Sequence, residues 1–188
     1  EEKNPESEVV AFWDAMMTKW GDEEKYNEGV ISQFKYSDEP EIIIVSALLH
    51  DIGHFTSEFG TFSMDDTTDK FHEDAGAEVL RPFFPNLVTD CVRYHVAAKR
   101  YLCAAKPSYL KRLSEASIHS LNLQGGPMNT DEVAAFEKNP NLKEIIKVRY
   151  YDDAGKRADL KTHSFSYYAP MVQRIVDAHA ATHSERAV

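Results

Sequence analysis

The stretch Ser46-Ala-Leu-Leu-His-Asp-Ile-Gly-His-Phe55 places a histidine and an aspartate side by side at the end of an apolar run. His50 and Asp51 follow residues 41–49 (EIIIVSALL), whose continuous apolar character is typical of a buried element. Because an unpaired carboxylate is costly in a protein interior, a buried His-Asp pair favours a metal site over ordinary packing. Adjacent helical residues point about 100° apart. Both side chains can therefore reach one metal only near a helix end, which Gly53 supplies.

Helical periodicity dominates the rest of the chain. In residues 7–20 (SEVVAFWDAMMTKW), apolar side chains recur at three- and four-residue intervals, as on one face of a helix. The polar segment 56–71 predicts a loop long enough to be functional, and the Gly-Gly-Pro content of residues 124–128 (QGGPM) predicts a turn. The predicted helices comprise residues 7–20, 39–53, 72–84, 85–102, 108–123, 130–139, 141–156 and 167–184. We therefore expect an all-α bundle that forms a single domain over residues 1–188.

Composition and charge limit the classes of partner. The net charge of −10, from 21 Lys and Arg against 31 Asp and Glu, argues against general nucleic-acid binding, although local cations can still attract an anionic substrate. The longest apolar run, residues 42–49, is too short to span a bilayer, and the acidic start has no signal-peptide character. Cys91 and Cys103 lack metal-motif spacing, and we expect both to be reduced. The sequence thus predicts a cytoplasmic protein without nucleic-acid or membrane partners, and it leaves the oligomeric state open.

Side chains with metal-binding chemistry occupy the ends and centres of several predicted helices. His72 begins one helix, His95 lies within the next, and Asp152 lies late in another. Ligands from separate helices can converge in a bundle core, and nitrogen and oxygen donors without thiolate suit iron, manganese or magnesium, with zinc also possible. Taken alone, each residue is more often an ordinary core or surface side chain, so the set carries more weight than its members. The candidate metal ligands are His50, Asp51, His72, His95 and Asp152, with Asp51 as the candidate bridge between two ions.

These motifs resemble the signatures of a known superfamily. The segment LLHDIGH, residues 48–54, looks like the signature of HD-domain proteins, which are all-α metalloproteins and include many phosphohydrolases. The wider set resembles the small HD-domain oxygenases that cleave organophosphonates with O₂, relatives of myo-inositol oxygenase that use a mixed-valent pair of iron ions. The motifs that carry the resemblance are HDIGH (50–54), HEDAGAEVLR (72–81), HVAAKRYLC (95–103), LSEAS (113–117), QGGPM (124–128) and RYYDDAGK (149–156). The similarity runs from about Tyr26 to Lys156.

The resemblance implies a role for each candidate ligand. It places His50, Asp51 and Asp152 on one iron and His72 and His95 on the other, with Asp51 bridging. Asp152 is preferred to its neighbour Asp153 because the family's aspartate precedes a lysine by four residues, and Lys156 stands at that position.

The resemblance also implies a phosphonate-binding set. Lys99, one helical turn after His95, matches the family's phosphonate-binding lysine, and His54, Ser117 and Arg149 match further contacts to the same group. We expect His54 and Lys99 to act in catalysis as well as in binding. A dianionic phosphonate needs charge-assisted donors, and arginine can offer two at once. Simpler explanations exist, since Lys99 can be a solvated side chain and Arg149 can pair with a neighbouring carboxylate.

Two residues near the N-terminus bear on the substrate. Tyr26 is expected to close over the site, and Gly29 aligns with a glutamate that engages the primary ammonium of the substrate in amine-using relatives. A quaternary ammonium has no N–H and needs space instead, so Gly29 favours (R)-1-hydroxy-2-(trimethylammonio)ethylphosphonate, converted to glycine betaine and phosphate. The alternative is 2-amino-1-hydroxyethylphosphonate, converted to glycine and phosphate, because the adjacent Glu28 could restore the carboxylate.

The chain departs from the family at one place, which keeps two other classes of function open. The family carries a further histidine, the last ligand of the first iron, after a segment like residues 25–33 (KYNEGVISQ). No histidine precedes His50, and the stretch expected between Gln33 and Phe34 is absent. We expect that stretch to belong to the natural polypeptide, because losing a ligand and a helical turn together should cripple the site. The rivals are a phosphohydrolase, which would use the His50–Asp51 pair to activate water through a metal, and a non-catalytic binding module.

Overall fold

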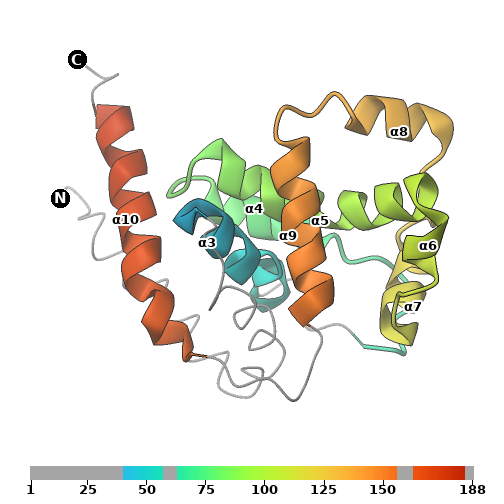
Figure 1. The fold of residues 1–188 in the computed structure, drawn as a ribbon. Coiled ribbons are helices and arrows are strands. Elements are labelled where there is room, and N and C mark those ends of the chain that lie inside the picture. The colour runs from blue at the N-terminus through green and yellow to red at the C-terminus, as the bar shows by residue number, and fades with distance from the viewer. Residues whose placement is uncertain (1–39, 57–62, 156–162, 185–188) are drawn as a thin grey trace.

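The structure is a computed structural model that describes residues 40–56, 63–155 and 163–184 (Figure 1). Within these ranges every regular element is a helix, which confirms the predicted all-α class. The elements are α3 (Glu41–Leu49), the 3₁₀ helix η3 (Ile52–Phe55), α4 (His72–Leu80), α5 (Asn86–Ala105), α6 (Pro107–Leu110), α7 (Glu115–Leu123), α8 (Thr130–Phe136), α9 (Leu142–Gly155) and α10 (Phe165–Ser184). The helix expected over residues 7–20 lies outside the described residues. None of the helices in the described part is long and apolar enough to cross a membrane.

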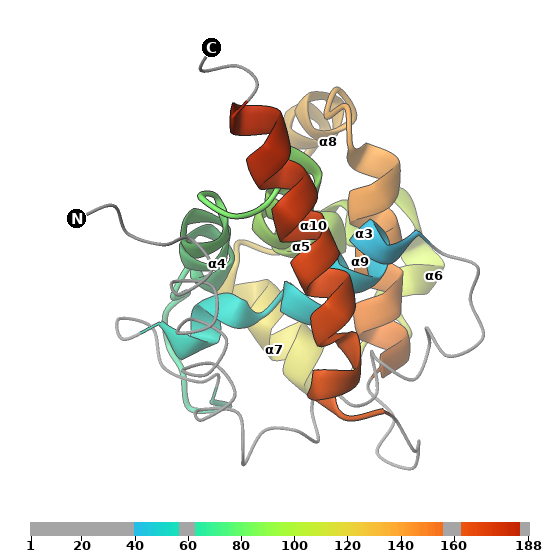
Figure 2. The same cartoon turned by 90° about the vertical axis from the view of Figure 1, so that its left-hand side faces the viewer.

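Helix α5 forms the centre of the bundle and packs against α3, α4 and α9. Its inner face carries Val88, Cys91 and Val92, which are fully buried against residues such as Leu49 of α3 and Val148 of α9. Figures 1 and 2 show α10 covering α3 on the side away from α6, α7 and α8. The helices that carry the candidate ligands therefore surround one core.

The first decisive segment ends differently from the sequence prediction. We expected one helix to run to Gly53, but α3 stops at Leu49, and a turn at His50 and Asp51 leads into η3. The reason is tertiary. Gly53 packs against the start of α4 so closely that a Cβ atom there would lie 1.7 Å from the carbonyl oxygen of His72. This contact ends the helix and joins the chain around Asp51 to the chain around His72.

The predicted helix over residues 108–123 is also wrong as a single element. It divides into α6 and α7, because the side chain of Ser114 accepts a hydrogen bond from the backbone N–H of Ser117 and caps α7. Serine is among the preferred residues at such a cap. The turn predicted at residues 124–128 is confirmed, since Gly125 (φ 90°) and Gly126 (φ 74°) both adopt left-handed conformations. Of the loop expected over 56–71, residues 56 and 63–71 are described and contain no helix.

Candidate metal centre

The five candidate ligands come from four parts of the bundle. His50 and Asp51 occupy the junction of α3 and η3, His72 is the first residue of α4, His95 lies in the middle of α5, and Asp152 lies in the last turns of α9. All five side chains are buried. The packing of α3, α4 and α9 around α5 brings them together from positions as distant as 50 and 152 in the sequence.

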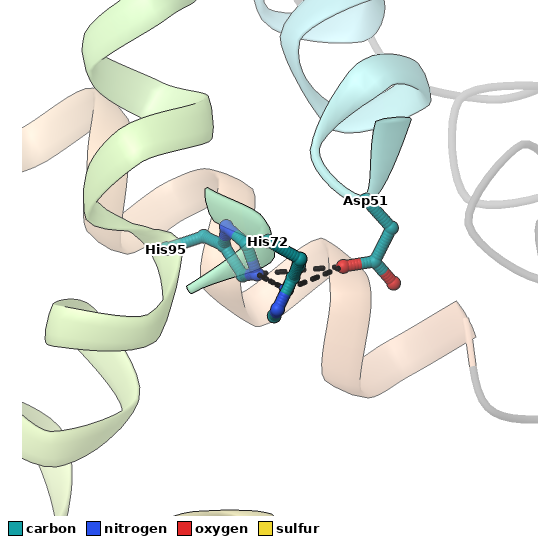
Figure 3. A group of neighbouring side chains, drawn as sticks. All are labelled: Asp51, His72 and His95. Atoms are coloured by element: carbon teal, nitrogen blue, oxygen red, sulfur yellow. Dashed lines mark hydrogen bonds and ion pairs between the residues drawn. The ribbon is translucent and has the colours of Figure 1, made fainter. Parts of the chain in front are cut away.

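Asp51, His72 and His95 form the tightest cluster (Figure 3). The Nε2 atoms of both histidines lie 3.4 Å from Oδ1 of Asp51 and 3.2 Å from each other. Each residue offers one ligand atom, and these atoms lie within 4.8 Å of one another. Burial lowers the pKa of His95 to about 4, although Asp51 acts in the opposite direction. The low pKa keeps the imidazole of His95 neutral and able to coordinate a metal. The donor set fits one metal ion.

His50 and Asp152 extend this cluster on the other side of Asp51. Nε2 of His50 lies 3.2 Å from Oδ2 of Asp51 and 3.7 Å from Oδ1 of Asp152, so Asp51 turns one oxygen to each side. This Nε2 is buried and has no hydrogen-bond partner within the described ranges. A buried polar atom without such a partner, next to two carboxylates, is the environment that a metal cation satisfies. These residues therefore fit a second metal ion that shares Asp51.

The electrostatics of the site follow from two buried carboxylates around His50. Burial alone lowers the pKa of His50, but Asp51 and Asp152 outweigh it and raise the pKa to about 10. For the carboxyl group of Asp51, burial acts to raise the pKa, but His50, His72 and His95 together hold that pKa well below its usual value. The site is thus built for positive charge, whether a proton or a metal ion carries it.

Backbone carbonyl groups orient two of the histidines. Nδ1–H of His50 donates to the carbonyl oxygen of Ala47 (2.8 Å), and Nδ1–H of His95 donates to that of Val92 (2.6 Å). In each ring Nε2 is therefore the nitrogen that faces the cluster. In His95 it carries the lone pair, whereas in His50, whose pKa is raised to about 10, a metal ion would take the place of the proton on Nε2.

The predicted phosphonate contacts adjoin this cluster. His54 is half-buried, and its ring stacks on that of His72 with centroids 3.9 Å apart. Lys99 is buried one turn after His95, and its Nζ donates to the Ser120 hydroxyl (2.8 Å). Ser117 is buried on the same turn of α7 as Ser120. Tyr26 and Gly29 lie outside the described residues.

Arg149 is buried in a network of its own. It forms an ion pair with Asp152 (Nη1 to Oδ2, 2.5 Å) and another with Asp153, and its Nε donates to the hydroxyl of Tyr109 (3.0 Å). The two carboxylates raise the pKa of Arg149 well above its usual value despite the opposing effect of burial. The pairing with a neighbouring carboxylate that the sequence left open is thus present, and it links Arg149 to a candidate ligand.

Several residues of the site were missed by sequence reasoning. Ser120 holds Lys99, Tyr109 and Asp153 hold Arg149, and Glu73 lies beside His72. Of these, Glu73 carried a local signal, because it follows a candidate ligand directly. Asp153 carried one too, since it stands four residues after Arg149 on α9. Ser120 and Tyr109 act across helices, and no spacing in the sequence indicates their contacts.

Comparisons with known proteins give this geometry its context. The HD domain family matches residues 15–124. The chain is 63% identical over 180 residues, 91% of this chain and 92% of the relative, to a Leisingera caerulea protein named [1-hydroxy-2-(trimethylamino)ethyl]phosphonate dioxygenase (glycine-betaine-forming). It is 41% identical over 138 residues, 71% of this chain and 67% of the relative, to a hydroxymethylphosphonate dioxygenase of Gimesia maris. An uncharacterized protein of Acanthamoeba polyphaga mimivirus is 34% identical over 132 residues, 69% of this chain and 60% of the relative.

Proposed function

We propose that this chain, which belongs to the HD domain family, is a dioxygenase that cleaves the carbon–phosphorus bond of 1-hydroxy-2-(trimethylammonio)ethylphosphonate and forms glycine betaine and phosphate. The observation that carries this function is the 63% identity, over 92% of the relative, to a protein whose name states that reaction. The relative named hydroxymethylphosphonate dioxygenase supports the reaction class. The glycine-forming reaction and the phosphohydrolase are less favoured, since neither of these names describes them.

A dioxygenase of this family implies a metal centre, and the cluster of Asp51, His72 and His95 fits one. The finer assignment in the proposal is two iron ions in a mixed-valent state, with O₂ as co-substrate. His72 and His95 would hold one ion, His50 and Asp152 the other, and Asp51 would present an oxygen to each. Bound iron would supply the one-electron chemistry that allows O₂ to react with an organic substrate.

The buried cations supply the attraction for the phosphonate. Within the described ranges, Lys99 is the one buried lysine and Arg149 the one buried arginine. Lys99 lies one helical turn after His95, and Arg149 forms an ion pair with Asp152. Arg149 already forms ion pairs with two carboxylates, whereas Nζ of Lys99 donates to the neutral hydroxyl of Ser120. In this proposal the ammonium of Lys99 and the guanidinium of Arg149 both attract the dianionic phosphonate, and Arg149 contributes directional hydrogen bonds.

The remaining contacts position the substrate. Half-buried and stacked on His72, His54 can contact a phosphonate that approaches the cluster from solvent. Ser117 adds a hydroxyl on the side of Lys99. Gly29 would leave room for the trimethylammonium group, and Tyr26 would close over it.

The experiment that tests the function compares two substrates in the iron-loaded protein. We expect 1-hydroxy-2-(trimethylammonio)ethylphosphonate to give glycine betaine and phosphate with consumption of one O₂ per turnover, and 2-amino-1-hydroxyethylphosphonate to react much more slowly. Oxygen uptake, phosphate release and the organic product are measured together. Phosphate release without oxygen uptake would instead support a phosphohydrolase. Substrate binding without turnover, in a protein of verified metal content, would support the binding module.

A second prediction tests the role of Lys99. The variant Lys99→Met should raise KM for the phosphonate roughly 10- to 100-fold, because a hydrogen bond to a charged group contributes about 1.5–3 kcal/mol. Its metal content should match that of the wild type, since Lys99 is not itself a candidate ligand. Lys106→Met is the matched control, because Lys106 lies just beyond the end of α5 and is exposed. An unchanged KM in Lys99→Met would remove this residue from the phosphonate site.

A further inference from the structure

Glu73 belongs to the motif HEDAGAEVLR and is a buried carboxylate beside the metal cluster, but neither the family resemblance nor the proposed reaction gives it a role. Its side chain is at the start of α4, and the residue is 8% exposed. Oε2 of Glu73 lies 3.3 Å from Nδ1 of His72 and has no hydrogen-bond partner within the described part of the chain. Burying a carboxylate oxygen in this way costs stability, so the arrangement calls for a functional explanation.

The two other histidines of the site show what that explanation is. His50 and His95 each follow at least one full helical turn, His50 at the end of α3 and His95 within α5. Nδ1–H of each ring can therefore donate to the carbonyl oxygen three residues earlier. His72 is the first residue of α4 and follows Phe71, whose left-handed conformation (φ 51°, ψ 40°) breaks the helical path. The helix therefore has no preceding turn whose carbonyl could orient His72. Instead, the side-chain carboxylate of Glu73 faces Nδ1 of His72.

We propose that Glu73 is the positioning residue of His72: Oε2 already lies 3.3 Å from Nδ1 and would accept a hydrogen bond from Nδ1–H when the ring turns its Nε2 to a bound metal. This contact keeps Nε2 as the lone-pair donor and directs it to the point shared with Asp51 and His95. His54 stacks on the face of the same ring, so Glu73 fixes the rotation that stacking leaves open. A carboxylate in this position also makes the imidazole a stronger donor, and loss of such a partner typically lowers metal affinity about 10- to 100-fold.

The charge of Glu73 acts on only one of the two candidate ion positions, the one formed by Asp51, His72 and His95, and not on the one beside His50 and Asp152. Neutral backbone carbonyls orient His50 and His95, whereas a negatively charged side chain orients His72. Removing Glu73 should therefore weaken the ion held by Asp51, His72 and His95 and leave the ion beside His50 and Asp152 nearly unchanged. The inference rests on the metal centre of the proposed function but does not depend on the substrate.

The experiment titrates Glu73→Ala and Glu73→Gln with Co²⁺ in competition with a chelator, with Fe²⁺ under anaerobic conditions as a repeat. Glu73→Ala should lose about 10- to 100-fold in affinity for one metal equivalent. Glu73→Gln should lose less, because its amide oxygen can still accept from Nδ1–H but carries no charge. The control is Glu78→Gln on the same helix, where Glu78 is exposed and pairs with Arg81 and Arg93. We expect it to bind metal as the wild type does.

The unfolding midpoint of the metal-free protein separates positioning from a structural role. It should stay constant or rise in Glu73→Ala, since a poorly paired buried carboxylate is removed. A fall in this midpoint together with an unchanged metal affinity would overturn the inference. In a His95→Ala background, which dismantles the cluster, Glu73→Ala should have no further effect on metal binding. If the wild type itself binds no metal tightly, the proposed function fails; if the wild type binds metal and Glu73→Ala binds it equally well, only the role of Glu73 fails.

Discussion

Replacing Asp51 with asparagine is expected to lower kcat/KM by at least about a thousandfold, the scale on which loss of a central catalytic group acts. Asp51 is the residue that both halves of the site share. Its Oδ1 faces His72 and His95, and its Oδ2 faces His50. Asparagine has nearly the same shape, but it removes the negative charge and turns one ligand oxygen into a donor of hydrogen bonds. Asparagine could then present one neutral oxygen to only one half of the site, so the two ions lose their shared anionic ligand.

Metal analysis of the purified Asp51→Asn protein checks this result independently of turnover. We expect metal content to fall for both equivalents, in contrast to the loss of one equivalent expected for Glu73→Ala. Asp74→Asn serves as the control, because Asp74 is an exposed aspartate of α4 that pairs with Arg93. A fully metallated and active Asp51→Asn protein would show that the cluster is not the metal centre.

The fold class could be predicted from the sequence because helical periodicity is a local property. Apolar side chains at three- and four-residue intervals indicate a helix whatever it packs against, and the all-α prediction is confirmed. The helix ends could not be predicted equally well. Helix α3 stops at Leu49 because Gly53 meets the backbone of α4, more than 15 residues further along the chain. No local pattern contains that contact.

The candidate site divides in the same way. The His50–Asp51 pair is visible in the sequence because its two members are adjacent and follow an apolar run. The grouping of His72 with His95 came from a family resemblance, since their meeting depends on how α4 packs on α5. The carboxylate partners of Arg149 lie three and four residues further along α9, so the sequence could indicate them. Its contact with Tyr109 was out of reach, because Tyr109 lies on another helix, 40 residues away in sequence. The roles of these residues in catalysis stay predictions that the variants above test.

Substituting Gly53 with alanine is expected to cost roughly 3 kcal/mol or more in the free energy of unfolding, at or beyond the upper end of ordinary overpacking. The new Cβ would lie 1.7 Å from the carbonyl oxygen of His72, 2.7 Å from its carbonyl carbon and 2.8 Å from the backbone N of Gly76. These are backbone atoms, so no side chain can rotate away to relieve the overlap. Either η3 must separate from α4, or α4 must unfold at its start. Denaturant unfolding of the metal-free protein measures the loss.

Gly126→Ala and Gly76→Ala provide graded controls for this substitution. Gly126 has φ 74°, and a Cβ added there would meet no described atom within 4 Å, so alanine should cost only the strain of a left-handed residue, about 1–2 kcal/mol. Gly76 lies within α4, and its Cβ would lie 3.0 Å from the backbone N of Gly53, 3.0 Å from the Ile52 side chain and 3.1 Å from Val92. None of these contacts is closer than 3.0 Å, so a shift of a few tenths of an ångström relieves them. Side chains can yield by a few tenths of an ångström, and alanine favours a helix, so its cost should fall well below that of Gly53→Ala.

The metal dependence of the Gly53 variant connects the fold to the site. The contact that alanine disrupts is the one that joins the chain around Asp51 to the first residue of α4, so separation of η3 from α4 also separates Asp51 from His72. Metal should therefore stabilise Gly53→Ala much less than it stabilises the wild type, whereas Gly126→Ala should gain as much from metal as the wild type does. If Gly53→Ala unfolds at the same denaturant concentration as Gly126→Ala and responds to metal equally, the close approach of Gly53 to His72 does not position the ligands.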